Sequence, residues 1–468
     1  MTALLNRLYK LDATGTTVGR ELQAGATTFA AMAYILAVNP SILAAAGMPQ
    51  PALITVTALT AAIGTLLMGF LTNYPLALAP GMGINAYFAF TVCLGLGVSW
   101  QSALGLVFVN GCIFLALSVT GIREKIIDAI PHQLKLAITC GIGLFIAFIG
   151  LKNGGIVVSS PATFVTHGDF GTSGVLLCFG GILLTSALVA RKVPGAIILS
   201  ILAVTIVGLF VSDGKGGHVT SMPASLFSLP ASPAPTLFQL NFDLLFHDFG
   251  KALPIILTLL LVDMFDNIGT LIGVTQRAGL LDASGRLPKA GKALVADSLA
   301  AIISSLLGTS TVVSYIESAS GVEAGGRTGL TGATTAILFL LALFLTPVIL
   351  AIPAAATAPA LVIVGVFMFQ SVAQLKLGRL HRDGADFPDH RRHPAQLQHR
   401  RGHRPRSGHL RRAPPRIRPR QVRLNGHLRA RADLQPALGP RDLHAHFLSP
   451  IRNSHRRYKK RKKCFCGR

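Results

Sequence analysis

The stretch Val262-Asp263-Met264-Phe265-Asp266-Asn267-Ile268-Gly269-Thr270 decides the fold of this chain. It sets two carboxylates inside a long apolar run that has the composition of a membrane-spanning helix. A charge at membrane depth costs roughly 3 kcal/mol or more, so it normally faces a cavity or a partner and marks a functional site. Asp263 and Asp266 are three residues apart, which places both on one face of a helix.

Two further stretches carry polar groups in apolar surroundings. Ser314-Tyr315-Ile316-Glu317-Ser318 contributes a third carboxylate, and Pro80-Gly81-Met82-Gly83-Ile84-Asn85 contributes an amide. We therefore expect the three stretches to form one site for a small polar solute, with Asp263, Asp266 and Glu317 as its acids. The simpler alternative for the two aspartates is a structural hydrogen-bond network between helices, and for the glutamate it is pairing with a nearby base.

The chain as a whole predicts an all-α polytopic membrane protein. Only 13% of its 468 residues are charged, and its mean hydropathy is +0.56. Apolar runs of about 20 residues, long enough to cross ~30 Å of hydrocarbon, repeat through most of the chain. They predict twelve spans, at residues 24–46, 53–72, 76–97, 101–120, 132–150, 174–190, 195–212, 252–274, 292–307, 309–328, 331–352 and 357–375.

The basic residues predict the orientation of these spans. Met1 to Arg20 is short and basic, which suits a cytoplasmic N-terminus. The loops after spans 4, 6 and 8 must then return to the cytoplasm, and they carry Arg123, Lys192 and Arg277 among their basic residues. We therefore expect a multi-pass protein of the cell inner membrane with a cytoplasmic N-terminus.

Spans 3 and 10 are irregular. Span 3 begins around Tyr74-Pro75-Leu76-Ala77-Leu78-Ala79-Pro80-Gly81, and span 10 begins around Gly308-Thr309-Ser310-Thr311-Val312-Val313-Ser314. In each, a short extended segment precedes a more helical half, and such backbone survives at membrane depth only where it is buried in protein or lines a cavity. Spans 3 and 10 are seven apart, as are spans 5 and 12. Since seven is odd, the spacing predicts two inverted repeats with the binding site at the broken spans.

The polar groups of these stretches suit a flat heterocycle such as a nucleobase. Carboxylates complement ring N–H donors, and the amide of Asn85 offers both a donor and an acceptor. In this hypothesis Tyr87 or Phe88 lies against the ring face, and Thr270 and Ile316 are further substrate contacts. Taken alone, the two aromatic residues are more often packing residues.

Buried acids also suggest how transport is driven. Removal from water favours the neutral form of a carboxyl group, so one of the acids, with Asp266 and Glu317 as candidates, would take up a proton outside and release it inside. Proton symport is the simplest hypothesis, and the sequence leaves sodium coupling open. We expect no enzyme activity, metal or cofactor; a membrane enzyme or receptor is the alternative from another class.

With these motifs the chain resembles the azaguanine-like branch of the nucleobase transporters, the adenine/guanine/hypoxanthine permeases. The resemblance covers about Leu11 to Gln374. It rests on four long motifs, Thr27–Leu36 (TTFAAMAYIL), Ala79–Phe88 (APGMGINAYF), Asp263–Thr270 (DMFDNIGT) and Glu317–Arg327 (ESASGVEAGGR).

The resemblance implies both residue roles and an architecture. It implies substrate contact for Asn85, Asp263 and Glu317, a place near the coupling step for Asp266, and proton-coupled purine uptake by alternating access. It also implies fourteen spans in two inverted repeats of seven, with a core domain that moves against a gate domain. The expected domains are a cytoplasmic N-terminus (1–23), core spans 1–4 (24–120), gate spans 5–7 (131–212), an outward loop (213–250), core spans 8–11 (252–352) and gate span 12 (357–375).

The last part of the chain departs from the family. Residues 377–468 carry 26 Lys and Arg against 5 Asp and Glu, a net charge of +21, whereas Met1 to Lys376 carry +3. Spans 13 and 14 are missing there, and the segment is compatible with a connector and an apolar span when read one base out of frame. We interpret this basic tail as a disordered frameshift product. The alternative is an arm that binds nucleic acid or anionic lipid.

Other functions and partners stay open on the same architecture. The chain would then carry another nucleobase, such as xanthine or uracil, or a small anion. Because an anion site would be expected to lack acids, the nucleobase is favoured. We expect no specific nucleic-acid partner, and the sequence leaves a homodimer open.

The frameshift interpretation makes a prediction. In cells that lack their own purine permeases, a version with the frame restored after Gln374 is expected to take up purines, whereas the chain as written has little uptake because its gate domain lacks two spans. Uptake of radiolabelled hypoxanthine measures this, and equal uptake by the two forms would refute it.

Overall fold

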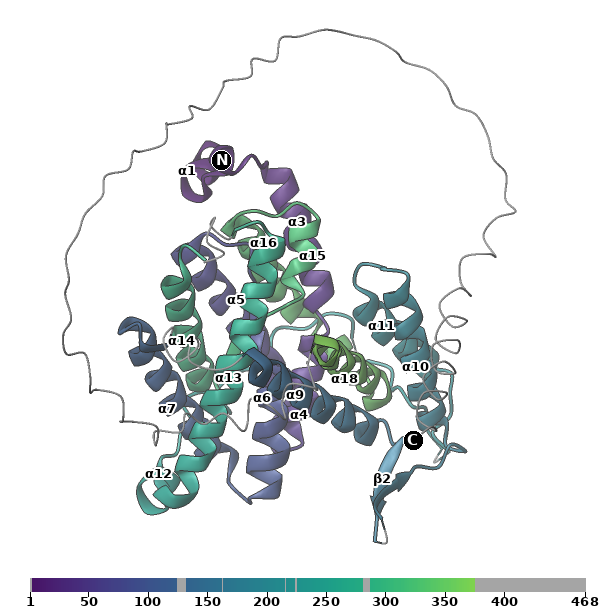
Figure 1. Cartoon of the computed structure of the whole chain (residues 1–468). Helices are drawn as coiled ribbons and strands as arrows, with labels where there is room; N and C mark the ends of the chain where they lie inside the picture. Colours follow the sequence, from purple (N-terminus) through teal and green to yellow (C-terminus); the bar gives the residue numbers. More distant parts are fainter. Residues whose placement is uncertain are drawn as a thin grey trace, which may run out of the picture. The chain divides into compact units, whose positions relative to one another are not determined.

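The computed structural model describes residues 2–123, 132–161, 163–214, 216–223, 225–280 and 287–374. Most of them are helical (Figure 1). The helices before the first long loop are α1 (Thr2–Tyr9), α2 (Leu11–Thr14), α3 (Val18–Met32), α4 (Ile35–Ala44), α5 (Gln50–Thr72), α6 (Met82–Ala86), the π-helical η1 (Tyr87–Gly95), α7 (Trp100–Val119), α9 (His132–Asn153), α10 (Ser173–Ala190) and α11 (Ala196–Gly208). They are followed by α12 (Asp243–His247), α13 (Phe249–Arg277), α14 (Ala290–Leu307), α15 (Ser318–Glu323), α16 (Gly329–Ala342), η2 (Leu343–Leu345), α17 (Thr346–Leu350), α18 (Ala354–Phe369) and η3 (Gln370–Gln374). The strands are β1 (Leu78–Pro80), β2 (Val157–Ser160), β3 (Phe164–His167) and β4 (Val312–Ser314).

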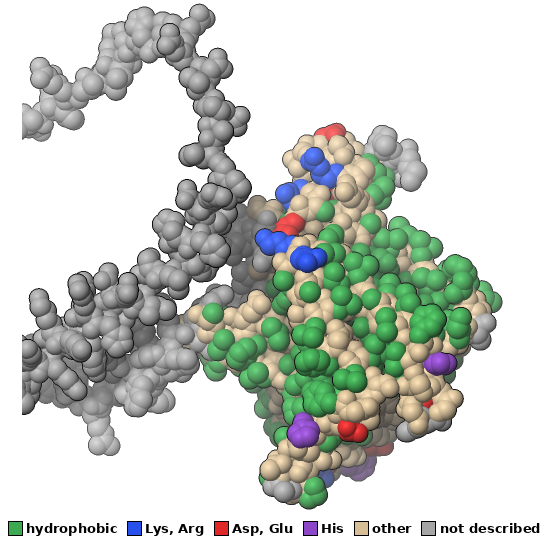
Figure 2. All heavy atoms as spheres, turned by 90° about the vertical axis from the view of Figure 1, so that its right-hand side faces the viewer, with side chains coloured by type: hydrophobic (Ala, Val, Ile, Leu, Met, Phe, Trp, Pro, Cys, Tyr) green, Lys and Arg blue, Asp and Glu red, His purple; other side chains and the backbone are tan. Residues whose placement is uncertain are grey.

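The prediction of a helical polytopic membrane protein is confirmed. Seven described segments are helical, long and apolar enough to cross a membrane, namely Val18–Ala44, Gln50–Thr72, Trp100–Val119, Leu136–Asn153, Ser173–Ala190, Ala290–Leu307 and Gly329–Leu350. Three more apolar helices are shorter, Met82–Gly95, Ala196–Gly208 and Ala354–Phe369. In Figure 2 hydrophobic side chains cover much of one face, as expected for a surface that meets lipid.

The described elements overlap the predicted spans, but the correspondence is not one helix for each span: predicted span 11 holds α16, η2 and α17, and predicted span 10 holds β4 and the six-residue α15. The predicted span 252–274, by contrast, is the helix α13, which runs from Phe249 to Arg277. The predicted outward loop 213–250 therefore ends in helix, because α12 and the first residues of α13 fall inside it. The loop after span 5 contains the hairpin of β2 and β3, which we did not predict. The proposed basic tail lies outside the described residues.

Helix contacts in the described part of the chain fall into two sets. In the first set, α16 packs on α3 and α5, α14 packs on α5 and α7, and α13 packs on α7 and α15. In the second set, α18 packs on α9, α10 and α11. Contacts between the sets are fewer and involve α13 and α6 with α9, α4 with α18, and α3 with α11.

Two short strands lie inside the first set. β1 falls within predicted span 3 and β4 within predicted span 10, and they pair antiparallel with Ala79 opposite Val313. The Gly81 amide extends the pairing by donating to the Thr311 carbonyl at 3.0 Å. Pro80 and Gly81 disfavour helix here, and the pairing satisfies backbone groups that would otherwise be unbonded in an apolar interior. Both strands are completely buried.

Glycines permit the closest helix contact of the second set. A Cβ atom on Gly143 of α9 would lie 2.6 Å from the Gly365 carbonyl oxygen of α18, and one on Gly365 would lie 2.4 Å from the Gly143 carbonyl oxygen. Small residues let helix backbones approach in membranes, where packing and not the hydrophobic effect holds helices together. α9 and α18 are thus fixed against each other at this pair.

This contact makes a prediction that carries its own control. Gly143→Ala is expected to lower the thermal unfolding midpoint of the purified protein, because the new methyl group meets backbone of α18 that cannot move alone. Gly141→Ala, in the same helix, has no atom within 4 Å of the new Cβ and is expected to leave the midpoint unchanged or raise it. Equal effects of the two substitutions would contradict this packing.

Candidate functional site

The acidic stretch that the sequence singled out lies on α13, in contact with α7, β4 and α15. Asp263 is 1% exposed. Its Oδ2 atom accepts hydrogen bonds from the Thr311 hydroxyl at 3.1 Å and from the Asn110 amide at 3.4 Å. Its Oδ1 atom has no hydrogen-bond partner among the described residues. A buried carboxylate with one unsatisfied oxygen is unusual in a merely structural network.

Glu317 comes to the same site from the other side. It lies between β4 and the short helix α15, and its Oε1 atom accepts a hydrogen bond of 2.6 Å from the Tyr34 hydroxyl. Asp266 on α13 is close enough to both Glu317 and Asp263 for their charges to interact. The structure therefore brings together the three acids that we expected to share a site.

Asn85 is more deeply engaged than the sequence predicted. It is completely buried in α6, its amide nitrogen donates to the Asn39 carbonyl oxygen, and its amide oxygen accepts from the Ser310 hydroxyl. Asn39 in turn donates to Thr57 at 2.7 Å. Both ends of the Asn85 amide are thus used within a chain of polar side chains that links α4, α5 and the residues before β4.

The other predicted contacts lie in different surroundings. Phe88 is 1% exposed and belongs to the hydrophobic core, and Tyr87 packs against that core. The Thr270 hydroxyl donates to the Asp266 and Asn267 carbonyls of its own helix, both at 3.0 Å. Ile316, next to Glu317, is 52% exposed. Of these four, Ile316 is the side chain with a large free surface beside an acid.

Sequence reasoning missed an ion pair behind Asp263. Arg123 and Asp297 lie 3.3 Å apart with 0% and 1% of their side chains exposed. Arg123 also donates to the Ser118 and Ser298 hydroxyls at 3.4 Å. The sequence assigned Arg123 to a cytoplasmic loop and gave it no partner; the turn after α7 directs its side chain inward onto α14. The available signal was the single acid in the apolar run of α14.

Unsatisfied polar atoms gather around this ion pair and Asp263. Among the described residues they include, besides Asp263 Oδ1, Asn110 Oδ1 and Arg123 Nε, while the Asn267 side chain lies within hydrogen-bonding reach of Asp297. An unsatisfied buried polar group costs about 1–3 kcal/mol, and native proteins keep such groups mainly at functional sites. The arrangement therefore indicates a polar site and not ordinary packing.

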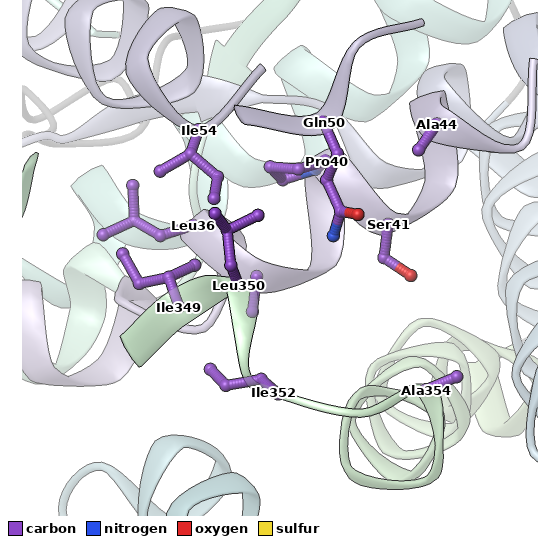
Figure 3. Close-up of a pocket in the computed structure, with 11 residues that line it drawn as sticks. Leu36, Pro40, Ser41, Ala44, Gln50, Ile54, Ile349, Leu350, Ile352 and Ala354 are labelled. Atoms are coloured by element: carbon purple, nitrogen blue, oxygen red, sulfur yellow. The ribbon is translucent and has the colours of Figure 1, made fainter. Parts of the chain in front are cut away.

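Two surface hollows lie elsewhere. One, of about 260 Å³, is drawn in Figure 3 and lies between α4, α5 and the α17–α18 connection, with Leu36, Pro40, Gln50, Ile349 and Ile352 among its lining residues. The other is lined by residues of the α7 start and the segment before α12. Neither hollow is lined by the acids of α13 or by Glu317.

The buried ion pair makes a stability prediction. Arg123→Met and Asp297→Asn are each expected to lower the free energy of unfolding by about 3–5 kcal/mol, because each leaves an uncompensated buried group. The double variant Arg123→Met/Asp297→Leu is expected to recover most of this stability. Thermal unfolding of the purified protein measures the effect. Lys251→Met, which removes the exposed pair with Asp248, is the control and is expected to leave the unfolding midpoint nearly unchanged, because water screens an exposed pair. Equal losses in all single variants would contradict the assignment.

Comparison with known proteins identifies the family of the chain. Residues 19–385 match the model of the permease family. Adenine permease AdeQ of Escherichia coli is 43% identical over 371 residues, which are 79% of this chain and 82% of AdeQ. Guanine/hypoxanthine permease PbuG of Bacillus subtilis is 43% identical over 380 residues, which are 79% of this chain and 85% of PbuG.

Solved structures share the fold at low sequence identity. The transmembrane domain of the cyanobacterial bicarbonate transporter BicA aligns with a TM-score of 0.57 at 18% identity, over 78% of this chain and 90% of that domain. The murine anion transporter Slc26a9 in the inward-facing state aligns with a TM-score of 0.55 at 13% identity, over 78% and 62% of the two chains. From the family match and the two permease relatives, the chain belongs to the permease family, in the adenine/guanine/hypoxanthine branch of the nucleobase transporters, and is a membrane transporter and not an enzyme.

Proposed function

We propose that the protein imports the purine nucleobases adenine, guanine and hypoxanthine by proton symport with alternating access. The observation that most supports the proposal is that Asp266 lies near both Asp263 and Glu317, which come from distant parts of the chain; Asp263 is buried, and Asp266 and Glu317 are half-buried. Relatives at 43% identity that are named adenine and guanine/hypoxanthine permeases supply the class of substrate.

The chemistry of the acids fits a purine. The unsatisfied Oδ1 atom of Asp263 and the carboxylate of Glu317 can accept hydrogen bonds from ring and exocyclic N–H groups, and such charge-assisted bonds are the strong ones. Ile316, half exposed beside Glu317, offers an apolar surface to the ring. A desolvated base with several N–H groups would thus satisfy atoms that the protein leaves unbonded.

The remaining proposed contacts require different degrees of rearrangement. Asn85 reaches a ligand only if its amide exchanges its bond to Asn39 or Ser310. Thr270 must likewise turn from its own helix backbone. Tyr87, half buried at the start of η1, needs less movement than the fully buried Phe88. Asp263 and Glu317 are therefore the main proposed substrate contacts, and the four other residues are secondary ones.

Proton coupling rests on the proximity of like charges. Asp266 interacts with Glu317 and with Asp297, and two carboxylates that close together are costly to ionise at the same time. A proton shared by Asp266 and Glu317 removes this repulsion. We propose that its uptake and release accompany substrate movement, with sodium as the alternative coupling ion.

The contact pattern supports the proposed core and gate domains. The first set of helices corresponds to the proposed core and the second to the proposed gate. The antiparallel pairing of β1 with β4 and the reciprocal contact of Gly143 with Gly365 are what a two-fold axis relating spans 3 and 10, and 5 and 12, would produce. We propose inverted repeats on these grounds, and a cytoplasmic N-terminus in the inner membrane from the basic residues.

A small anion or another nucleobase is the second candidate. The fold neighbours named as bicarbonate and anion transporters favour the anion, whereas three acids in one site oppose it. Competition against radiolabelled hypoxanthine bound to the purified chain separates these candidates. Adenine and guanine are expected to compete, and bicarbonate is not; competition by xanthine or uracil alone would favour the other nucleobases.

The proposal predicts different roles for the acids. Asp263→Ala and Glu317→Ala are each expected to weaken hypoxanthine binding at least about 10-fold, since each removes a charge-assisted hydrogen bond. Asp266→Asn is expected to keep part of the binding while uncoupler-sensitive accumulation in cells is lost, which is measured in the frame-restored version. Asp248→Asn, at the protein surface, is the control and should change neither. Unchanged binding in the two alanine variants would remove those residues from the site.

A further inference from the structure

Tyr34 lies at the junction of α3 and α4 in the first span. Its backbone keeps right-handed helical dihedrals, so the two helices continue as one span, Val18–Ala44. Its side chain is completely buried. Its hydroxyl donates the 2.6 Å hydrogen bond to Oε1 of Glu317. A residue that sequence reasoning left unassigned thus contacts a proposed substrate-binding acid directly.

The hydrogen bond from Tyr34 to Glu317 favours one protonation state of the carboxyl group. A tyrosine hydroxyl has one hydrogen, and donating it to a carboxylate stabilises the ionised form of that carboxylate. The bond also occupies Oε1, one of the two carboxylate oxygens, and so restricts the orientation of the glutamate side chain.

The other groups that face Glu317 act differently. On α13, Asp266 places a like charge near it, which opposes ionisation. Tyr315, which directly follows β4, is close to it, but its hydroxyl donates to the Pro80 carbonyl at 2.6 Å. On α3, which packs against α15, the Glu21 carboxylate accepts from backbone amides at the start of α16, and the Arg20 side chain lies beside Gly325 beyond the far end of α15. Tyr34 is therefore the described side chain that counteracts the charge of Asp266.

We propose that Tyr34 is a positioning residue for nucleobase recognition: its hydrogen bond stabilises the ionised form of Glu317 with one oxygen directed at the ligand, and so sets the pH below which binding is lost. The inference rests on the proposed function, because it assumes that Glu317 accepts a hydrogen bond from the base. It adds to that function a residue that controls its pH dependence.

The test is the pH profile of hypoxanthine binding by the purified full chain. As pH falls, binding by the wild type is expected to disappear when Glu317 takes up a proton. Tyr34→Phe is expected to move the midpoint of this loss up by about one pH unit, the size expected for one hydrogen bond to a charged group, with little change in affinity on the alkaline side. Tyr315→Phe removes a neighbouring buried hydroxyl that bonds to backbone and is expected to leave the midpoint in place.

A second variant keeps Tyr34 intact. Glu317→Asp shortens the acid and withdraws it from the tyrosine. Because a free aspartate ionises at lower pH than a free glutamate, the midpoint moves down if the hydrogen bond to Tyr34 is irrelevant, and up if the bond controls ionisation. The upward shift is the expected result, and it does not depend on the folding of Tyr34→Phe.

The outcomes distinguish failure of the proposed function from failure of the role of Tyr34. A wild-type chain that binds no purine at any pH refutes the proposed function. Binding whose acid limb is the same in wild type and Tyr34→Phe, or an affinity that falls equally at every pH, refutes the role of Tyr34 alone, since a purely structural residue would give that result.

Discussion

The constraint on which this structure depends is the cost of holding carboxylates away from water inside a helical membrane protein. Each acid at membrane depth needs hydrogen-bond donors, an opposite charge or a ligand. Here Asp297 has Arg123, Glu317 has Tyr34, and Asp263 has donors for only one of its two oxygens. Asp263 therefore keeps one unsatisfied oxygen, Oδ1, which an N–H group of the proposed substrate would satisfy.

Irregular backbone is what brings the partners together. The strands β1 and β4 place Thr311 beside Asp263 and Glu317 beside Asp266, while their pairing satisfies the main chain. Tyr34 reaches Glu317 from the helical span Val18–Ala44. Continuous helices present side chains on fixed faces, whereas the short extended segments let Thr311 and Glu317 approach the acids of α13.

The buried ion pair of Arg123 and Asp297 lies near the proposed site but is not among the proposed substrate contacts. Arg123 and Asp297 join the turn after α7 to α14 directly behind Asp263, and a buried pair of this kind is weak evidence for stability. The pair brings both a positive charge and a further carboxylate close to Asp263.

The sequence by itself determined the membrane class, the approximate positions of the spans and the two acidic stretches, because hydropathy and isolated charges are local properties that a single chain displays directly. Asp263, Asp266 and Glu317 could be chosen for that reason. Only the tertiary structure decided which partners they meet: Tyr34 lies 283 positions from Glu317, and Arg123 lies 174 positions from Asp297. Such pairings depend on how distant spans pack and turn, and hydrophobic periodicity does not encode them, which is why the sequence assigned Arg123 to a loop without identifying its buried partner Asp297.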